Sequence, residues 1–202
     1  MSIYNSFKRL IDFSSALVGL CLLAPVLVFI SIFIKFESRG PVLFRQKRVG
    51  RAGRPFHIYK FRTMRAGSER NGLPITVQKD PRITRLGTFL RRYKLDELPQ
   101  LINVLRGEMS LVGPRPELEK YVTIYGEDYR EILSILPGMT DFAALEFRDE
   151  NERLRAAQNP EEVYIHQILP EKIKLYKKYL RQRGFSTDLS LIARTIWAVF
   201  RK

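Results

Sequence analysis

Two neighbouring acids, Asp96 and Glu97, lie inside a strongly basic stretch of the sequence. Basic residues crowd the approach to them, and a Gly-Pro-Arg-Pro turn follows at residues 113–116. A carboxylate can bind Mg²⁺ together with substrate phosphates, and it can attack phosphorus to form an acyl phosphate. Arginine and lysine side chains can neutralise the charge of the phosphates. The residue types therefore permit phosphoryl transfer at Asp96.

The same position has a simpler structural explanation. Pro99 is tolerated only in the first turn of a helix, so a helix is expected to begin near Asp96. Acids at a helix start commonly cap exposed backbone N–H groups, and adjacent helical residues do not face one another. From residue types alone, a helix cap is the favoured interpretation of Asp96, and a phosphate site is the alternative. The cations available to such a site are Lys60, Arg62, Arg91 and Arg115.

The elements that must position these residues are predicted as a short β-hairpin followed by helices, which gives a helix-rich α+β fold. Residues 42–49 and 56–64 are rich in β-formers and flank a Gly50–Gly53 turn. Lys60 and Arg62 share one face of the second strand, where an ordinary solvated face is the simplest interpretation. Residues 65–84 are predicted to form a polar loop. Amphipathic spacing predicts helices near 82–93, 96–106, 127–136, 161–183 and 190–202.

The last of these helices is basic and amphipathic. Its apolar face carries Leu191, Ile192, Ile196 and Phe200, and Trp197 lies beside that face. A helix packed on the core and a helix lying at a membrane interface explain this pattern equally well, because tryptophan and flanking basic residues suit the headgroup zone.

Composition limits the class of protein. The 202 residues suit one domain, or one domain with an appendage, and a hydrophobic content of 45% argues against wholesale disorder. Cys21 is the single cysteine, and its apolar surroundings predict a buried thiol. The two histidines match no common zinc spacing. The formal net charge of +14 is concentrated before residue 66, where there are 12 Lys/Arg and 2 Asp/Glu. This excess indicates an anionic partner, such as a membrane, a nucleic acid or a phosphorylated substrate.

An apolar segment of 22 residues without a charge runs from Phe13 to Ile34. As one helix it would be about 33 Å long, enough to cross a bilayer core. A cleaved signal peptide has a shorter apolar region and a small-residue cleavage site, so it fits poorly. Basic residues flank both ends, and Pro25 breaks or kinks the middle. These features favour a helix–break–helix that enters one leaflet and returns, with a kinked single span as the alternative.

Three motifs follow this segment in order: Lys-Phe-Arg-Thr-Met at 60–64, Leu-Asp-Glu-Leu-Pro-Gln-Leu at 95–101, and Gly-Pro-Arg-Pro at 113–116. Together they resemble the bacterial sugar transferases, which are monotopic polyprenyl-phosphate phosphoglycosyl transferases. The resemblance covers nearly the whole chain and fits the small members that consist of little more than the catalytic unit. It implies a re-entrant membrane hairpin over residues 1–38 and a cytoplasmic catalytic domain over 39–202.

The resemblance also implies a reaction. Members of this family use Mg²⁺ and a ping-pong mechanism to transfer a sugar-1-phosphate from a UDP-sugar to undecaprenyl phosphate, and they release UMP. They act at the cytoplasmic face of the bacterial inner membrane, so anionic membrane lipid is a further implied partner, nucleic acid is not, and a homo-oligomer is left open. The implied assignments are Asp96 as nucleophile and metal ligand, Glu97 as the acid that assists attack by the lipid phosphate, and Lys60, Arg91 and Arg115 as phosphate-binding residues. Arg62 is assigned to the phosphate-binding residues because of its charge, and Pro25 is assigned as the hairpin break.

The chain departs from the family pattern at two places. Ala24-Pro25 stands where the family has Ser-Pro, so a hydroxyl is missing at the predicted break. Residues 137–148 begin as Pro-Gly-Met-Thr, close to the family's Pro-Gly-Ile-Thr-Gly, and diverge from Asp141 onward. We interpret the divergent part as the mark of a different sugar-recognition subgroup.

A protein of another class would explain part of the sequence. A membrane-anchored basic module that binds polyanions without catalysis accounts for the charge and the anchor. It leaves the Asp96-Glu97 pair and the Gly-Pro-Arg-Pro turn without a role, and the chain lacks the motifs of common nucleic-acid modules. The enzyme is therefore the leading hypothesis.

Overall fold

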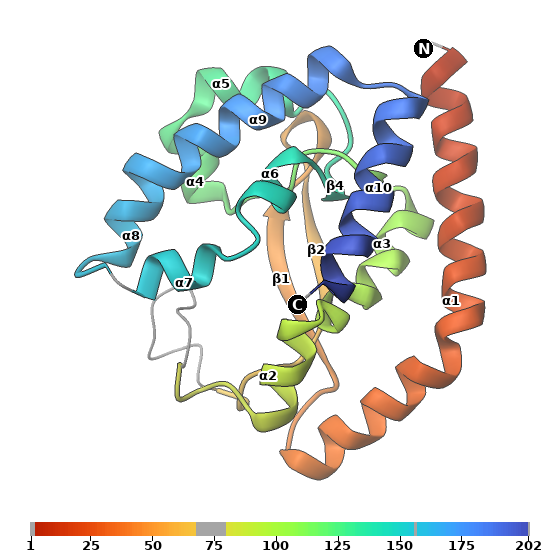
Figure 1. Cartoon of the computed structure of the whole chain (residues 1–202), viewed down its shortest axis with the longest axis vertical. Coiled ribbons are helices and arrows are strands. Elements are labelled where there is room, and N and C mark those ends of the chain that lie inside the picture. Colours follow the sequence, from red (N-terminus) through yellow and green to blue (C-terminus); the bar gives the residue numbers. More distant parts are fainter. Residues whose placement is uncertain (1–2, 68–79, 156, 202) are drawn as a thin grey trace.

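The computed structural model describes residues 3–67, 80–155 and 157–201 of the chain. Two long strands cross the middle of the molecule, and helices lie on both sides of them (Figure 1). The described strands form two small sheets of two strands each. The fold is therefore α+β and rich in helices, as the sequence predicts.

The predicted β-hairpin is confirmed. Strands β1 (Leu43–Val49) and β2 (Pro55–Phe61) pair antiparallel along their whole length. The connecting turn, η1 (Arg51–Gly53), ends on a glycine with a positive φ, which glycine adopts without steric cost. Buried side chains on the inner face of β2 pack against the core. This packing fixes the position of Lys60 near the end of the strand.

The second sheet has no counterpart in the sequence-based predictions. Strands β3 (Ser110–Val112) and β4 (Gly138–Thr140) pair in parallel, but each is too short to show a periodic pattern. A Cβ added at Gly138 would lie 2.1 Å from the nitrogen of Gly113, so only glycine permits this approach. The two paired strands bring the Gly-Pro-Arg-Pro turn, which follows β3, next to the start of the segment that diverges from Asp141 onward.

The predicted amphipathic helices are present, several of them in shorter pieces. Pro99 lies in a 3-10 helix, η2, which continues into α3, and Gly107 ends α3 with a φ of 77°. A π-helical turn, η3, interrupts the helix predicted over 161–183. Most of the predicted loop over 65–84 lies outside the described residues. The bounds are α2 (Arg85–Arg92), η2 (Leu95–Gln100), α3 (Leu101–Arg106), α4 (Glu119–Ile124), α5 (Gly126–Ile132), α6 (Phe142–Glu146), α7 (Glu150–Arg155), α8 (Pro160–Val163), η3 (Tyr164–Ile168), α9 (Leu169–Gln182) and α10 (Phe185–Phe200).

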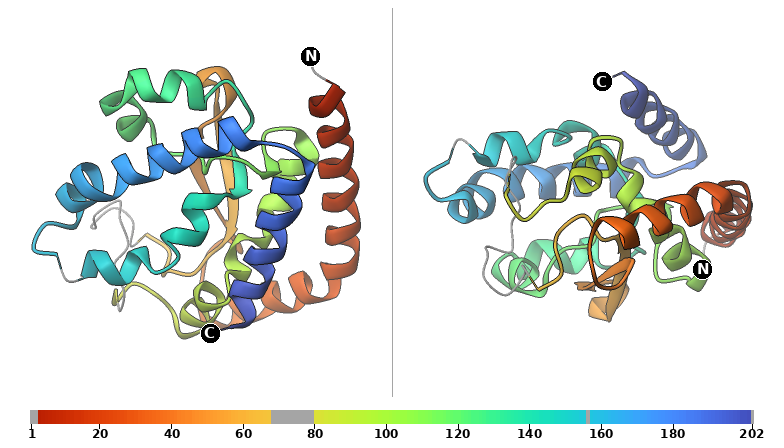
Figure 2. Two further views of the ribbon diagram at one scale, coloured as in Figure 1. Left: turned by 45° about the horizontal axis from the view of Figure 1, so that its top comes forward. Right: turned by 90° about the horizontal axis from the view of Figure 1, so that it is seen from below.

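The apolar segment forms one long helix, α1 (Ile3–Glu37), with Pro25 inside it. The helix changes direction part-way along its length (Figures 1 and 2), as expected where a proline removes a backbone hydrogen bond. Among the described helices, α1 alone is long and apolar enough to cross a membrane. Its path through a membrane stays a prediction.

Most apolar side chains of α1 are exposed, including Leu22 and Phe36, at 73% and 85%. Cys21 is exposed as well, so the prediction of a buried thiol is wrong. The reason is that an apolar run on this helix faces outward over most of its length, whereas the prediction assumed that apolar neighbours mean a core. Exposed apolar surface of this extent indicates contact with lipid or with another apolar partner.

Polar contacts fix the N-terminal half of α1 to the rest of the fold. Asp12 is only 3% exposed, and its carboxylate accepts hydrogen bonds from Ser110 Oγ (2.7 Å) and Leu111 N (3.1 Å). Arg9 donates to two backbone carbonyls at the end of α3, where a cation complements the helix dipole. Arg9, one of the two basic residues just before the apolar run, is therefore engaged in a structural contact.

Helix α10 divides its apolar residues between the core and the surface. Leu191 is 1% exposed and packs with Val112 and Tyr179. Ile196 and Trp197 are 55% and 60% exposed. The interpretation as a core-packed helix therefore holds for the side that carries Leu191. The interpretation as an interfacial helix stays a prediction for the exposed side.

Candidate active site

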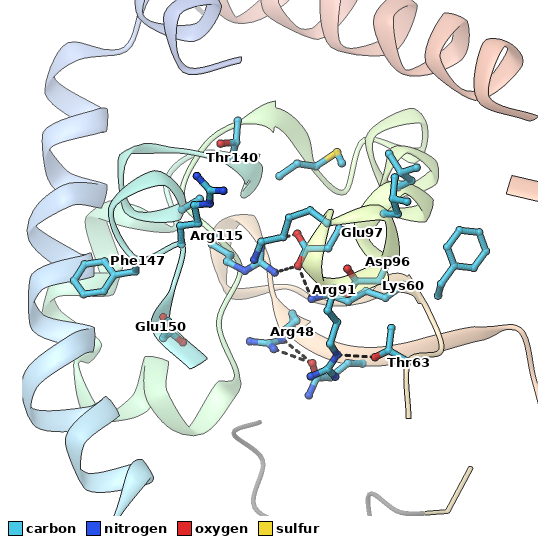
Figure 3. Close-up of a pocket in the computed structure, with 18 of the residues that line it drawn as sticks. Arg48, Lys60, Thr63, Arg91, Asp96, Glu97, Arg115, Thr140, Phe147 and Glu150 are labelled. Carbon is cyan, nitrogen blue, oxygen red and sulfur yellow. Dashed lines mark hydrogen bonds and ion pairs between the residues drawn. The ribbon is translucent and has the colours of Figure 1, made fainter. Parts of the chain in front are cut away.

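A cavity of about 960 Å³ opens in the middle of the described fold. Its walls come from β1, β2, η2, the turn after β3, the segment from β4 to α7, and helices α9 and α10. Figure 3 shows most of the predicted site residues along one side of it, with Phe147 and Glu150 on the other side. The predicted site residues that border this cavity are Lys60, Arg62, Arg91, Asp96, Glu97 and Arg115.

Asp96 lies in η2 and is 7% exposed. Its Oδ1 atom is buried and has no hydrogen-bond partner among the residues that the structure describes. The helix is preceded by Lys94 in the left-handed region, with a φ of 57°. The Asp96 carboxylate therefore does not cap the helix start, and the helix-cap interpretation is wrong. A tight left-handed turn followed by a 3-10 helix places this carboxylate in the cavity wall instead.

Glu97 has the opposite environment to its neighbour. Its carboxylate accepts hydrogen bonds from Lys60 Nζ (2.9 Å) and from both terminal nitrogens of Arg115, one of them at 3.0 Å. Burial alone would raise the pKa of Glu97, but the charges of Arg115 and Lys60 outweigh it and hold this pKa well below its usual value. Glu97 is therefore an ionised carboxylate that fixes two cations.

The pKa of Asp96 is shifted in the other direction. Burial raises it, and the negative charge of Glu97 raises it further, while Lys60 and Arg91 oppose the shift. Two adjacent acids thus differ in both hydrogen bonding and proton affinity. Environments that shift the pKa values of two carboxylates in opposite directions are typical of sites in which the two acids have separate tasks.

Helix α2 positions Arg91 beside Asp96. A Cβ at Gly87 would lie 2.1 Å from the carbonyl oxygen of Thr63, so α2 packs directly against the chain that leaves β2. Arg91 Nε then donates to Thr63 Oγ1 at 2.8 Å. Burial lowers the pKa of the Arg91 guanidinium, and the charge of Asp96 counteracts this shift. A glycine on α2 therefore sets how close this cation comes to the acid.

Arg62 borders the cavity but directs its hydrogen bonds away from Asp96 and Glu97, and Pro25 is not among the lining residues. Arg62 is 6% exposed, and its guanidinium is bound at the C-terminal end of α1. The acceptors are the carbonyls of Ile34 (3.3 Å), Ser38 (2.7 Å) and Arg39 (2.9 Å). These contacts give Arg62 a structural role in holding α1, and they show that it is not on the solvated face that its spacing from Lys60 favoured. Its predicted phosphate-binding role stays a prediction. Pro25 lies within α1, and no described residue of α1 lines the cavity.

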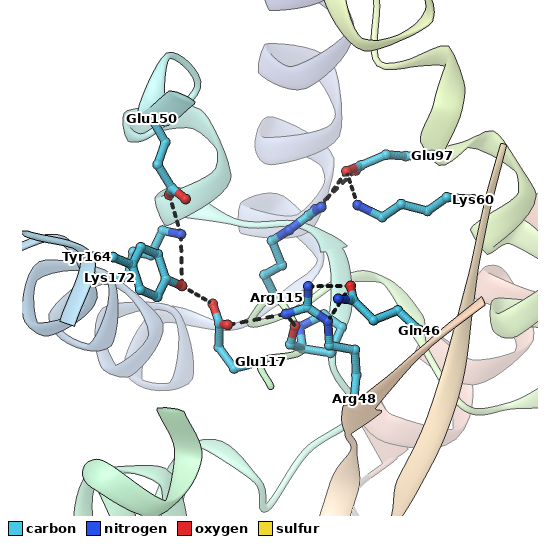
Figure 4. A network of polar contacts seen from close by, with 10 residues as sticks. Gln46, Arg48, Lys60, Glu97, Arg115, Glu117, Glu150, Tyr164 and Lys172 are labelled. Atoms are coloured by element: carbon cyan, nitrogen blue, oxygen red, sulfur yellow. Dashed lines mark hydrogen bonds and ion pairs between the residues drawn. The ribbon is translucent and has the colours of Figure 1, made fainter. Parts of the chain in front are cut away.

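Several cavity residues were not found by sequence reasoning. They form a polar network on the side of the cavity away from Asp96 (Figure 4). Glu117 follows the Gly-Pro-Arg-Pro turn directly, so its position next to a motif was a usable signal. The other members carry no such signal, because the fold gathers them from β1, α7, η3 and α9. They are Arg48, Glu150, Tyr164, Lys172 and Tyr176.

Comparison with known proteins gives a match over nearly the whole chain. The family described as bacterial sugar transferase matches residues 3–202. Among curated proteins, a "Putative undecaprenyl-phosphate N-acetylgalactosaminyl 1-phosphate transferase" of Bacillus subtilis (strain 168) is 47% identical over 114 residues, which are 56% of this chain and 64% of that protein.

Two further relatives match over more of the chain. A "UDP-glucose:undecaprenyl-phosphate glucose-1-phosphate transferase" of Escherichia coli (strain K12) is 34% identical over 96% of this chain and 40% of that protein. A protein of the same name from Caulobacter vibrioides (strain ATCC 19089 / CIP 103742 / CB 15) is 35% identical over 94% of this chain and 68% of that protein. The chain spans less than two thirds of the length of the B. subtilis and E. coli relatives.

Proposed function

Because the chain belongs to the bacterial sugar transferase family, we propose that it transfers a sugar-1-phosphate from a UDP-sugar to undecaprenyl phosphate and releases UMP. The names of the relatives support the substrate classes, and they differ in the sugar. The proposal therefore specifies a UDP-sugar without choosing among sugars. One observation carries it: a buried carboxylate oxygen of Asp96 without a described partner, in a cavity whose lining includes the cations Lys60, Arg91 and Arg115.

The proposed reaction has two displacements at one phosphorus. In the first, an oxygen of Asp96 attacks the β-phosphorus of the UDP-sugar, and the bond to the α-phosphate oxygen breaks. UMP leaves with the electron pair, and the sugar-phosphate is held on Asp96. In the second, an oxygen of undecaprenyl phosphate attacks the same phosphorus, and the bond to Asp96 breaks. The carboxylate is restored, and the lipid carries the sugar on a diphosphate.

Three cations are suited to the phosphate oxygens in both steps. Lys60 and Arg115 are held by Glu97, and Arg91 is held by Thr63. Fixed cations at a phosphoryl group stabilise the charge that develops in the transition state without reorganising. Since Glu97 stays ionised, its supported role is to position Lys60 and Arg115; the assisting role in attack by the lipid phosphate stays a prediction.

The residues present fit a Mg²⁺ ion that is bound mainly through the substrate. Among the described residues no group of three or more His, Cys, Asp or Glu is arranged to hold a metal. Mg²⁺ usually keeps several waters and binds through one or two carboxylates plus substrate phosphates. Asp96, with its free buried oxygen, is the carboxylate that would hold it. When bound, the ion would neutralise part of the phosphate charge.

We further propose that the protein is monotopic, with its catalytic residues on the cytoplasmic face. Two observations support this placement. The N-terminal half of α1 is fixed to Ser110 and Leu111 through Asp12, and its C-terminal end is fixed through Arg62. Both ends of the helix therefore attach to one catalytic unit. A straight span would instead separate its two ends by about the 30 Å of the bilayer core.

UMP release tests the proposed reaction. Purified protein is mixed with undecaprenyl phosphate, Mg²⁺ and each of a panel of UDP-sugars, and UMP is measured. We expect UMP release with at least one of the UDP-sugars. Release over many turnovers should require both the UDP-sugar and undecaprenyl phosphate. Folded protein that binds anionic vesicles but releases no UMP with any sugar would instead support the polyanion-binding module.

A further inference from the structure

The cavity has a second polar end that the proposed chemistry at Asp96 does not use. We call it the polar wall and define it as Arg48, Glu117, Glu150, Tyr164, Lys172 and Tyr176, all of which border the cavity. It is formed by elements far apart in the sequence, namely β1, the chain after the Gly-Pro-Arg-Pro turn, α7, η3 and α9. In Figure 4 Glu117, Glu150, Tyr164 and Lys172 lie on the far side of Arg115 from Glu97 and Lys60.

Hydrogen bonds and one ion pair connect five members of the polar wall in one chain, and Tyr176 lies outside that chain. Tyr164 donates to Glu117 Oε1 at 2.7 Å, and Arg48 donates to Glu117 Oε2 at 3.3 Å. Lys172 lies 3.5 Å from the Tyr164 hydroxyl and is paired with Glu150. The side chains of Glu117 and Lys172 are 4% and 7% exposed. The network is thus buried, and its geometry is fixed before any ligand binds.

Charge separates the polar wall from the Asp96 end of the cavity. Within the network, the cations Arg48 and Lys172 are matched by the anions Glu117 and Glu150, so the set is formally neutral. At the other end, Lys60, Arg91 and Arg115 exceed Asp96 and Glu97 by one positive charge. A phosphate is therefore best placed at the Asp96 end, and an uncharged polar group at the polar wall.

Tyr176 supplies an independent sign of a ligand. Its side chain is 0% exposed and borders the cavity, yet its hydroxyl has no hydrogen-bond partner among the described residues. Buried hydroxyls normally have a partner, because leaving one unpaired is costly. A hydroxyl can both donate and accept, so it suits a ligand that carries hydroxyls of its own. The neighbouring Tyr164 lies in a π-helical turn, a form often found at functional sites.

We propose that the polar wall binds an uncharged hydroxylated ring of the UDP-sugar donor, either its hexose or its ribose. This inference rests on the proposed function. Arg115 connects the two ends, since its guanidinium binds Glu97 and only one residue separates it from Glu117 in the chain. Phosphates held at Arg115 would thus place an attached ring beside Glu117 and Tyr176. The lipid substrate fits elsewhere, because its chain is apolar and α10 lines the cavity with the apolar side chains Ile192, Ile196 and Val199.

Tyr176→Phe tests this inference without disturbing the network. The substitution removes only a hydroxyl that has no described protein partner, so thermal stability should not fall. In a two-substrate ping-pong reaction, each kcat/KM reports its own half-reaction. We expect kcat/KM for the UDP-sugar to fall roughly three- to tenfold, the value of one net hydrogen bond, and kcat/KM for undecaprenyl phosphate to stay unchanged.

Tyr129→Phe is the matched control. Tyr129 also has a buried hydroxyl without a described partner, but it does not border the main cavity: it lines a small second cavity that shares only Arg115 and Glu117 with it. We expect wild-type values of both kcat/KM in this variant. A second test variant, Glu150→Gln, removes the charge balance of the polar wall at a residue 22% exposed, and it should also lower kcat/KM for the UDP-sugar alone.

UMP as a competitive inhibitor distinguishes the two rings. If the bound ring is ribose, Tyr176→Phe should weaken inhibition by UMP in proportion to the loss with the UDP-sugar. If it is the hexose, UMP inhibition should be unchanged. Wild-type kinetics for both Tyr176→Phe and Glu150→Gln, or equal losses with Tyr129→Phe, would overturn the inference while leaving the enzyme intact. Failure of the wild-type protein to release UMP would overturn the proposed function and this inference together.

Discussion

At the scale of single residues, Asp96 and Glu97 are adjacent in the chain but opposite in environment. Glu97 binds Lys60 and Arg115 and is held ionised. Asp96 keeps a buried oxygen free of described partners, and its pKa is raised. The 3-10 helix turns each residue about 120° from the last, so neighbours in the chain point to different surroundings. A nucleophile and a cation-holding residue can therefore be adjacent.

Replacing Asp96 should separate catalysis from folding. Asp96→Asn keeps the shape of the side chain but removes the attacking oxygen charge. We expect UMP release to fall by at least about 10³-fold, as when a nucleophile is removed. Thermal stability should stay equal or rise, since an unpaired buried charge is costly. The measurements are UMP release and a melting curve. An active Asp96→Asn protein would refute the nucleophile assignment.

The raised pKa of Asp96 predicts an acid limb in the pH profile. A carboxylate attacks only when ionised, and it is protonated below its pKa. The kcat/KM for the UDP-sugar should therefore fall on acidification with a midpoint above the ordinary aspartate value of about 3.9. In Glu97→Gln one cause of the shift is removed, and Lys60 and Arg115 are released to favour the ionised form. The midpoint should then move to lower pH; an upward shift would contradict the proposed pairing.

Lys60 and Arg62 show how far residue spacing can be trusted. Alternation placed both side chains on one strand face, but β2 ends at Phe61. Lys60 is still within the strand and reaches Glu97, whereas Arg62 has left it and reaches α1. A two-residue period holds only as long as the strand does. The motifs predicted the cluster at Asp96, but the polar wall depends on contacts across the chain that no local pattern contains.

At the scale of elements, local signals explain which parts were predictable. The hairpin has a glycine turn, and the longer helices have amphipathic spacing, so both were found. Strands β3 and β4 pair across 28 residues of sequence and are three residues long each, so nothing local marks them. The π-helical turn at Tyr164 was missed because it interrupts an apolar pattern without ending it.

Arg62 links two of these elements, and its substitution should affect stability more than catalysis. Its guanidinium donates to carbonyls at the end of α1, and lysine cannot reproduce that planar fork. We expect Arg62→Lys to lower the free energy of unfolding by about 2 kcal/mol and to leave kcat/KM nearly unchanged at low temperature. Arg115→Lys is the comparison, since it should lower kcat/KM. The measurements are melting in detergent and UMP release. A selective loss of kcat/KM in Arg62→Lys would restore its phosphate-binding role.

At the scale of the whole molecule, most of the large exposed apolar side chains are gathered on α1 and α10, with Phe89 on α2 and Ile124 on α4 in addition. The cavity opens along α10, through Ile192, Ile196 and Val199. An amphiphilic substrate therefore finds cations at Asp96 and apolar lining on α10 within one cavity. Ile196 both borders the cavity and is 55% exposed. Under the proposed function, α10 would therefore offer an apolar path from a membrane surface to the phosphate site.

The attachment of α1 at both ends leads to a prediction about topology. If Asp12 and Arg62 hold the two halves of the helix against one catalytic unit, the N-terminus must lie on the same side of the membrane as that unit. The test uses Cys21→Ser, which removes the single native thiol. Single cysteines are then introduced, either before Met1 or at exposed Arg54 in the turn of the β-hairpin.

A membrane-impermeant maleimide reports the side of each cysteine. In bacterial cells that express the protein, both cysteines should be protected in intact spheroplasts and labelled in inverted vesicles, because both lie on the cytoplasmic face. Arg54→Cys serves as the marker of the catalytic unit. A kinked single span gives a different result: the N-terminal cysteine is labelled in spheroplasts while Arg54→Cys is not. That outcome would require one end of α1 to separate from the catalytic unit in the membrane, against the contacts made by Asp12 or Arg62.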